Sequence, residues 1–269
     1  GFIIDPAGYV VTSDHVIADA SEITVVLNDG SRYTARVQGR DSKTDLALLK
    51  IDAGQPLPYV EFGDSDSARA GDWVVAVGNP FGLGGTVTAG IISARGRDIQ
   101  SGSYDDFLQI DAPINRGNSG GPLINLDGEV IGVNRMIYSR TGGNLGIGFA
   151  IPINKARRIV NDLIQYGEVI EIWLGMEVQN LDNGLSHYFN LPTRGGVLVS
   201  ALDDDGPAHQ AGVRQGDVIL SIGGRRVRAV AQAREVIRGY RPGSKVVVGF
   251  SRKGKSEKVE VTLERRGDR

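Results

Sequence analysis

The chain of 269 residues is long enough for two domains, since domains mostly run to roughly 100–200 residues. Hydrophobic residues make up 41%, charged residues 23%, and the net charge is −2, a globular balance that gives no reason to expect binding to nucleic acid or an anionic membrane. Cysteine is absent, which excludes thiol catalysis, cysteine-ligated metals and disulfides, and no apolar run reaches the ~18 residues of a membrane span.

Short β-strand patterns separated by Gly, Pro, Asn and Asp fill the chain up to about residue 151. They are GFII and YVVT around the turn DPAG, a hairpin around Asp29 and Gly30, and then DLALLKI, DWVVAVG, TVTAGIISA, DFLQI, EVIGVNRMIY and GIGFAI. Many short strands with frequent turns indicate a barrel or a sandwich. Because GFIID already has a strand pattern, we expect the chain to start inside a domain, with any signal or anchor segment absent.

Helical spacing follows in INKARRIVNDLIQYG, where Gly167 is a natural C-terminal stop. We therefore place the end of the first domain at residue 167. Residues 168–269 have the pattern of a smaller α+β unit. Its predicted strands are WLGMEV, GVLVSAL, DVILSI and KVVVGFSRKGKSEKVEVTL, and its predicted helices lie in PAHQA and VAQAREVIRGY.

The stretch INRGNSGGPL, residues 114–123, holds a single serine, Ser119, among glycines. Glycine and asparagine also cluster in ordinary tight turns, so this stretch alone leaves open whether Ser119 is a turn residue or a nucleophile. A nucleophilic serine needs a general base and an acid that orients the base.

Only one histidine, His15, lies in the β-rich region, since His187 and His209 belong to the smaller unit. His15 follows a strand pattern, where a side chain can reach a cleft, although a lone histidine is more often an ordinary polar residue. Asp45 heads an apolar strand, where it could cap a turn or hold an imidazole. The order His15, Asp45, Ser119 matches that of chymotrypsin and neither the subtilisin nor the α/β-hydrolase order.

Segments along the whole chain resemble one known family. GYVVTSDHVI, TDLALLKI, VGNPFGLGGTVTAGIISARGRD and NRGNSGGPL resemble the HtrA/Deg family of chymotrypsin-fold serine proteases. WLGM and GPAHQAGVRQGDVILSIGG resemble the PDZ domain that such proteases contain. The resemblance implies a mainly β fold: a two-β-barrel trypsin-like protease domain in residues 1–167, truncated at its N-terminus, followed by a small α+β PDZ domain in residues 168–269.

The resemblance also implies a catalytic triad. Ser119 would attack the scissile carbonyl, His15 would take and return the proton, and Asp45 would fix the imidazole tautomer. The backbone N–H groups of Gly117 and Ser119 would form the oxyanion hole, in a loop that Asn118 helps to shape. No cofactor and no metal is implied.

Substrate contacts are expected at two segments. APIN, which precedes the nucleophile, has no acid, so a pocket edged by Ile114 should take small or medium aliphatic side chains rather than Lys or Arg. Asn134, Arg135, Met136 and Ile137 resemble the strand that pairs with extended substrate. The implied substrates are unfolded or misfolded polypeptides.

Two further sites follow from the resemblance. Trp173, Leu174, Gly175 and Met176 match the PDZ carboxylate loop, whose N–H groups bind a peptide C-terminus. Without the resemblance, Trp173, Leu174 and Met176 would be interpreted as ordinary core residues. Arg97 matches the arginine of the regulatory loop that relays activation, and the plain alternative is a solvated loop arginine.

The sequence departs from the family pattern in three places. Arg135 stands where the family usually has a threonine that supports the catalytic acid, so this arginine could pair with Asp45 and misplace it. VIEIWLGM replaces the usual Arg-Gly before the PDZ loop. The first strand with its loop, and the N-terminal trimerisation segment, are absent from the match.

The resemblance predicts an ATP-independent protease for damaged proteins in the bacterial periplasm, assembled as a homotrimer or a multiple of trimers and binding no nucleic acid. GNPFGLGGT lacks the Gly-Lys-Ser/Thr of a phosphate loop and is expected to be a barrel turn. Two alternatives stay open: a catalytically quiet chaperone or peptide-binding protein, and a regulatory protease with one target that a PDZ ligand activates.

Overall fold

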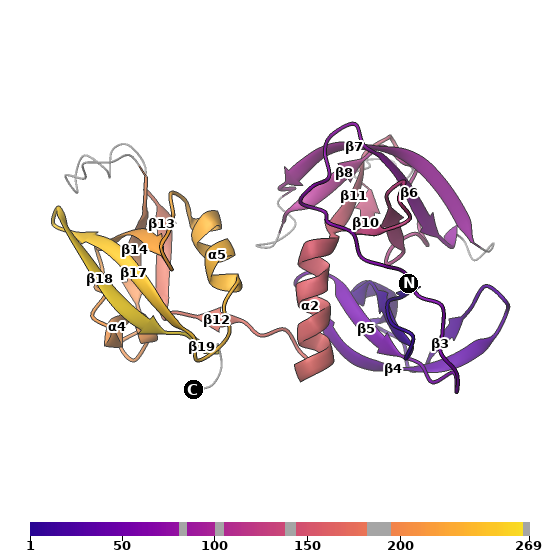
Figure 1. The fold of residues 1–269 in the computed structure, drawn as a ribbon, viewed down its shortest axis with the longest axis horizontal. Helices are drawn as coiled ribbons and strands as arrows, with labels where there is room; N and C mark the ends of the chain where they lie inside the picture. The colour runs from indigo at the N-terminus through magenta and orange to yellow at the C-terminus, as the bar shows by residue number, and fades with distance from the viewer. Residues whose placement is uncertain (81–84, 100–104, 138–143, 182–194, 266–269) are drawn as a thin grey trace. The chain divides into compact units, whose positions relative to one another are not determined.

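The structure is a computed structural model that describes residues 1–80, 85–99, 105–137, 144–181 and 195–265 (Figure 1). It divides into two compact units, Gly1–Val169 and Ile170–Arg269. His187 and part of the expected turn GNPFGLGGT lie outside the described residues.

An antiparallel sheet forms the first half of the first unit, in the order β1-β2-β5-β4-β3. It is open, with β1 and β3 at its edges. The central strand β5 is buried over Leu46 to Leu49, which explains its almost wholly apolar sequence. The strands are β1 (Phe2–Ile3), β2 (Tyr9–Thr12), β3 (Ile23–Val26), β4 (Arg32–Asp41) and β5 (Leu46–Lys50).

A closed barrel forms the second half, in the order β10-β11-β8-β7-β6-β9. Its interior is packed with small and branched side chains such as Ala76, Ile92, Ile110 and Ala150, so it is a core rather than a pore. The strands are β6 (Trp73–Gly78), β7 (Thr86–Arg97), β8 (Phe107–Ile110), β9 (Pro122–Ile124), β10 (Val130–Ile137) and β11 (Gly148–Pro152).

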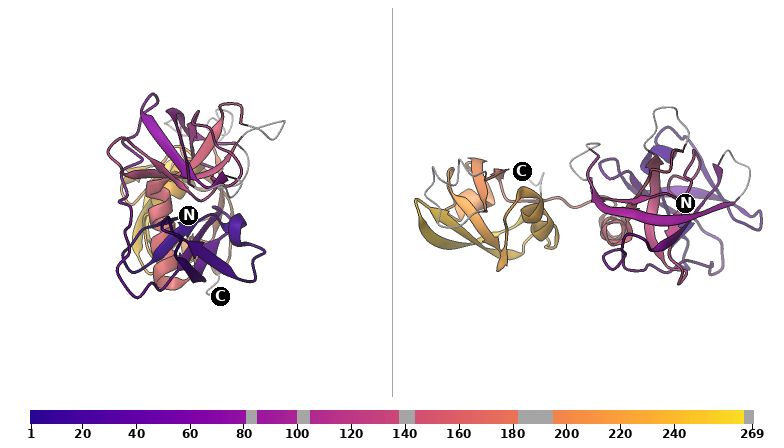
Figure 2. Two further views of the ribbon diagram at one scale, coloured as in Figure 1. Left: turned by 90° about the vertical axis from the view of Figure 1, so that its right-hand side faces the viewer. Right: turned by 90° about the horizontal axis from the view of Figure 1, so that it is seen from above.

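Helix α2 (Ile153–Tyr166) runs along both the open sheet and the barrel (Figures 1 and 2). Its apolar face, including Leu163, belongs to one cluster with Leu48 of the open sheet and Val133 of the barrel. The predicted stop is present: Gly167 adopts φ 75°, and its N–H donates to the Leu163 carbonyl. This cluster joins the two halves of the unit.

The second unit is a sheet in the order β13-β14-β15-β17-β18, with β16 paired to β15 and a separate β12–β19 pair. Its core includes Val197, Ile219, Val236 and Phe250. The strands are β12 (Ile172–Trp173), β13 (Met176–Asn180), β14 (Val197–Leu202), β15 (Val218–Ile222), β16 (Arg225–Arg226), β17 (Lys245–Arg252), β18 (Lys255–Thr262) and β19 (Glu264–Arg265), and the helices are α4 (Pro207–Gln210) and α5 (Val230–Arg238).

Two elements next to the predicted triad were not anticipated. α1 (Asp14–Ile17) is a single helical turn directly after the predicted strand, and β9 is a three-residue strand that begins within the glycine-rich stretch. Both are too short to show a periodic pattern in sequence.

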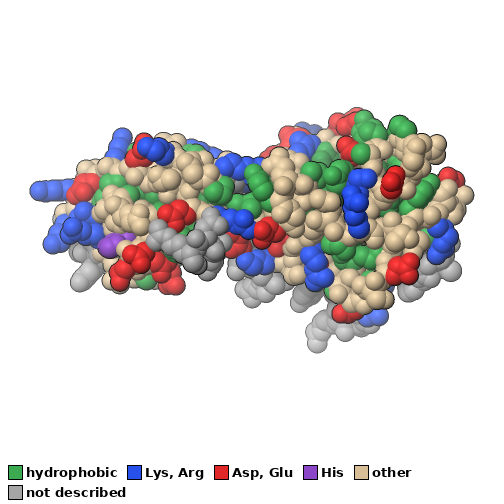
Figure 3. All heavy atoms as spheres, turned by 90° about the horizontal axis from the view of Figure 1, so that it is seen from below, with side chains coloured by type: hydrophobic (Ala, Val, Ile, Leu, Met, Phe, Trp, Pro, Cys, Tyr) green, Lys and Arg blue, Asp and Glu red, His purple; other side chains and the backbone are tan. Residues whose placement is uncertain are grey.

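The described helices include none that is both long and apolar enough to cross a bilayer. On the face in Figure 3, described side chains of both charge signs are interspersed, as the near balance of 30 basic and 32 acidic residues suggests.

Candidate active site

His15 projects from α1, directly after β2. The start of this helix is fixed from two sides: the Asp14 N–H donates to the Asp45 carbonyl (3.2 Å), and Arg40 Nε on β4 lies 2.8 Å from Asp14 Oδ1 as an ion pair. The His15 side chain remains 54% exposed. The imidazole is therefore held on a fixed backbone and stays accessible.

The carboxylate of Asp45 faces the imidazole of His15. His15 Nδ1 lies 2.9 Å from Asp45 Oδ1 and 2.8 Å from Oδ2, and the His15 backbone N–H donates to Oδ1 at 3.0 Å. An ionised carboxylate only accepts hydrogen bonds, so we assign the ring proton to Nδ1. Nε2 then has a free lone pair, as a general base requires.

Asp45 is buried, with 7% of its surface exposed, in the turn that joins β4 to β5. Its φ is +60°, a left-handed conformation that only one other non-glycine residue among those described, Lys253, adopts. Aspartate tolerates this conformation better than most residues, yet such strain typically costs about 1–3 kcal/mol and clusters at functional sites.

Ser119 lies on the loop between β8 and β9, where glycine is required by packing. An added Cβ at any of three loop glycines would meet backbone atoms of another segment, and two of the three also have positive φ; they are Gly117 (φ +104°), Gly120 (φ +79°) and Gly121. At Gly120 the atom met is the nitrogen of Ser13, the residue before α1. The glycines thus let the serine loop approach the histidine segment.

The two backbone N–H groups on either side of Asn118 have no acceptor among the described residues. They belong to Gly117 and Ser119, whereas the Asn118 N–H donates to the Asn115 carbonyl at 3.1 Å. Asn118 is buried, with 1% exposed. The arrangement offers two donors, from Gly117 and Ser119, with Asn118 holding the loop between them.

The Ser119 hydroxyl donates to the backbone carbonyl of Arg135 at 2.9 Å. No hydrogen bond joins it to His15 within the described residues. The Arg135 side chain lies toward the acid, with Nε 3.4 Å from Asp45 Oδ2. The expected pairing with Asp45 is therefore present, but the carboxylate keeps its contacts with His15.

The end of β10 has one edge without a strand partner among the described residues. β10 pairs with β11 as far as Ile137, but with β9 only as far as Val133. Asn134 is fully buried, and its N–H donates to the Gly121 carbonyl at 2.9 Å, so it supports the serine loop. Met136 is 37% exposed.

Ile114 lies in the barrel core, with 2% exposed, and its carbonyl accepts a hydrogen bond from the side chain of Asn144 at 3.0 Å. Arg97 ends β7, where its Nε donates to Gln109 Oε1 on β8 at 2.9 Å. The roles predicted for these two residues stay predictions.

In the second unit, β12 ends at Trp173 and β13 begins at Met176, with Leu174 and Gly175 between them. Leu174 joins the core, and Gly175 has φ +70°, with no room for a Cβ against Gly206. The N–H groups of Leu174 and Gly175 have no acceptor in the described ranges, and β13 pairs only with β14. A free strand edge thus begins beside free N–H groups.

A side-chain contact that the sequence did not suggest joins this edge to α5. Asn180 Oδ1, at the end of β13, accepts the N–H of Val230 at 2.8 Å. A single asparagine at a strand end has no distinguishing signal in sequence.

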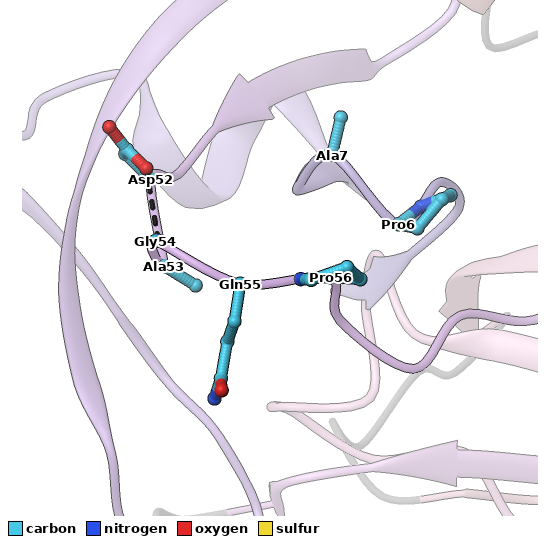
Figure 4. A pocket seen from close by; sticks show the side chains of 7 residues that line it. All are labelled: Pro6, Ala7, Asp52, Ala53, Gly54, Gln55 and Pro56. Carbon is cyan, nitrogen blue, oxygen red and sulfur yellow. Dashed lines mark hydrogen bonds between the residues drawn. The ribbon is translucent and has the colours of Figure 1, made fainter.

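A shallow hollow lies at the turn after β1 and is separate from the triad residues (Figure 4). Its lining includes two prolines, Pro6 and Pro56, and one ionisable side chain, Asp52, which accepts the N–H of Gly54 at 3.1 Å. This lining contains no nucleophile with a base.

Comparisons with known proteins agree with this geometry. Residues 1–133 match the family model of the trypsin-like peptidase domain, and residues 173–263 match that of the PDZ domain. These matches confirm the predicted mainly β fold, a trypsin-like domain followed by a PDZ domain; the first of the two expected barrels is the open five-stranded sheet in this chain.

Among curated relatives, "Probable periplasmic serine endoprotease DegP-like" of Rhizobium meliloti is 49% identical over 263 residues, covering 98% of this chain and 52% of that protein. The protein of the same name from Chlamydia trachomatis is 47% identical, covering 98% and 53%. The chain thus spans about half the length of the curated relatives it matches.

Two solved structures are similar over most of their length. The HtrA-type protease AlgW with a decapeptide superposes with a TM-score of 0.88 at 41% identity, covering 99% of this chain and 82% of that one. The serine endoprotease from Yersinia pestis gives a TM-score of 0.76 at 38% identity, covering 98% and 87%.

Proposed function

The chain belongs to the HtrA/DegP-like serine proteases, and we propose that it is a serine endopeptidase that cuts unfolded or misfolded polypeptides without ATP in the bacterial periplasm. One observation supports the activity above all others. A buried carboxylate orients the exposed imidazole of His15, and Ser119 lies on a loop with two free N–H donors.

In the proposed reaction, Ser119 Oγ attacks the scissile carbonyl while His15 Nε2 takes its proton and later delivers it to the leaving amine. Asp45 holds the imidazole through Nδ1 and stabilises the imidazolium that forms. The N–H groups of Gly117 and Ser119 bind the oxyanion, where one donor is typically worth about 2.7–4 kcal/mol. The Ser119 hydroxyl must first turn away from the Arg135 carbonyl.

The proposed substrates follow from the edge of β10. An extended peptide can add as a strand along the end of β10, where the pairing with β9 ends at Val133. A folded protein rarely offers an extended segment with free N–H and C=O groups, whereas an unfolded chain does. With no acid before the nucleophile, we expect cuts after aliphatic residues, at a pocket edged by Ile114.

The proposed role of the second unit is to bind peptide C-termini. The N–H groups of Leu174 and Gly175 would receive the carboxylate, and the free edge of β13 would pair with the peptide. Binding there would regulate cleavage, with Arg97 as a candidate relay. The relatives named periplasmic support the location, and we propose the homotrimer, or a multiple of it, by analogy alone.

The test is degradation of a loosely folded protein by the chain and by Ser119→Ala, with mass-spectrometric mapping of the cut sites. Ser67→Ala is the matched control, because Ser67 is exposed and its hydroxyl donates to the nearby Asp64 carbonyl. Cuts after Val, Ile, Ala or Leu that vanish only in Ser119→Ala are expected. Equal cutting by Ser119→Ala would exclude this nucleophile.

A catalytically quiet binding protein and a regulatory protease are separated by two further measurements. Labelling of Ser119 by a fluorophosphonate is expected of an assembled triad and not of a quiet binding protein. Activation by a peptide with a free C-terminus, and not by its amidated form, would indicate regulation through the second unit.

A further inference from the structure

We propose that Arg135 is a positioning residue for the triad, whose guanidinium holds the carboxylate of Asp45 in the orientation that His15 requires. This inference rests on the proposed serine-protease function. It concerns a side chain on the barrel that acts on an acid belonging to the open sheet.

Both oxygens of the Asp45 carboxylate have donors, and these come from opposite halves of the unit. Oδ1 accepts the His15 backbone N–H at 3.0 Å, and Oδ2 lies 2.8 Å from His15 Nδ1 and 3.4 Å from Arg135 Nε. His15 Nδ1 also lies 2.9 Å from Oδ1, so His15 alone contacts both oxygens. Arg135 adds a donor on Oδ2 that does not move with His15, and this donor further opposes rotation of the carboxylate about its Cβ–Cγ bond.

The guanidinium of Arg135 is itself held in place. The register of β10 against β11 shifts between Asn134 and Met136, which marks a bulge at Arg135, and bulges commonly redirect a side chain near an active site. Its guanidinium carbon lies 5.1 Å from the ring centroid of Phe107, which is 2% exposed and packs against Phe149. The guanidinium thus lies over this ring in a cation–π contact, which helps the barrel to hold its position.

A cation beside Asp45 could instead draw the carboxylate away from His15, and the distances decide between the two effects. The imidazole keeps the short contact at 2.8 Å, while the arginine is 0.6 Å farther away. Hydrogen bonds weaken as they lengthen, so His15 remains the dominant partner. Arg135 therefore orients the acid without displacing it.

The side chain of Arg135 can be tested apart from its backbone. Its carbonyl accepts the Ser119 hydroxyl, and a substitution of the side chain leaves that carbonyl in the chain. The informative variants are Arg135→Gln, Arg135→Lys and Arg135→Thr. Arg157→Gln is the matched control, because Arg157 also lies over a phenylalanine, at 5.5 Å from Phe62, but donates to carbonyls.

The first readout is the labelling rate of Ser119 by a fluorophosphonate, together with kcat and KM on a chromogenic peptide. Arg135→Gln is expected to lower labelling and kcat about tenfold with KM within about twofold, because orientation and not binding is lost. Arg135→Lys should recover part of the loss, and Arg157→Gln should match the unchanged chain. Arg135→Thr, whose hydroxyl can also donate to the carboxylate, should likewise recover part of the loss. Labelling by Arg135→Gln at or above the rate of the unchanged chain would overturn the proposal.

The second readout does not depend on turnover. The proton between His15 Nδ1 and Asp45 gives a low-field ¹H NMR signal, assigned by its loss in Asp45→Ala. A freed carboxylate lets this proton exchange with water, so we expect the signal to disappear at a lower temperature in Arg135→Gln. An unchanged signal would overturn the proposal, and failure of the unchanged chain to label would instead count against the proposed function.

Discussion

The open sheet and the closed barrel contribute to the candidate site in different ways. The sheet side supplies His15 and Asp45 already paired, with His15 Nδ1 2.8 Å from Asp45 Oδ2. The backbone of Asp45 is strained, with φ +60°. The barrel side supplies Ser119 on a loop whose glycines are required by packing. The Ser119 hydroxyl donates to the backbone carbonyl of Arg135. The base is thus preorganised locally, whereas the nucleophile depends on how the two halves meet.

The largest expected effect comes from removing one member of the predicted triad from each half of the first unit. Ser119→Ala and His15→Ala should each lower kcat by about 10⁶-fold, and the double variant should lose little more, because the two residues act as one unit. Single-turnover kinetics on an unfolded protein would measure this. Losses that multiply in the double variant would show that the two halves act independently.

Asp45→Asn changes the sheet half alone, and we expect a loss of about 10⁴-fold in kcat. The amide can donate to Nδ1, which places the ring proton on Nε2 and removes the base. Asparagine also tolerates the left-handed backbone at φ +60°, so the fold should be retained. Kinetics with a parallel thermal melt would check both statements, and a collapsed melt would indicate a structural role instead.

Gly120→Ala changes the contact between the halves. A Cβ there would meet the backbone of Ser13 and Thr12, so the serine loop must move away from the histidine segment, and we expect about a 10²-fold loss in kcat/KM. Gly128→Ala is the matched control: it has a similar φ of +82° but nothing within 4 Å. Equal losses in the two variants would assign the effect to backbone strain and not to the contact.

The sequence predicted the residues of the candidate site better than it predicted the contacts between the two halves. Residue order and strand patterns led to His15, Asp45 and Ser119, and the family departure led to the pairing of Arg135 with Asp45. The sequence could not decide whether Arg135 would draw Asp45 away from His15, because this depends on distances between the open sheet and the barrel. In the structure Asp45 keeps its 2.8 Å contact with His15, while Arg135 Nε lies 3.4 Å away. The cation–π contact of Arg135 with Phe107 could not be predicted either, because Phe107 belongs to an ordinary apolar strand.

The smallest expected effect concerns Asp64, which lies in the segment between β5 of the open sheet and β6 of the barrel. This segment is attached to the start of α2. The Asn154 side chain donates to Asp64, and this hydrogen bond is the main reason that the pKa of Asp64 lies below its ordinary value of 3.8. A lowered folded pKa adds stability that is present above the unfolded pKa and is lost as pH falls through the folded one. Asn154→Ala should therefore lower the denaturant midpoint slightly at about pH 7 and by less at about pH 3. A difference that stays constant with pH would show that the effect does not act through the Asp64 carboxylate. The alanine variant keeps the backbone N–H of residue 154, which donates to Ser65 Oγ, so that hydrogen bond does not contribute to the difference.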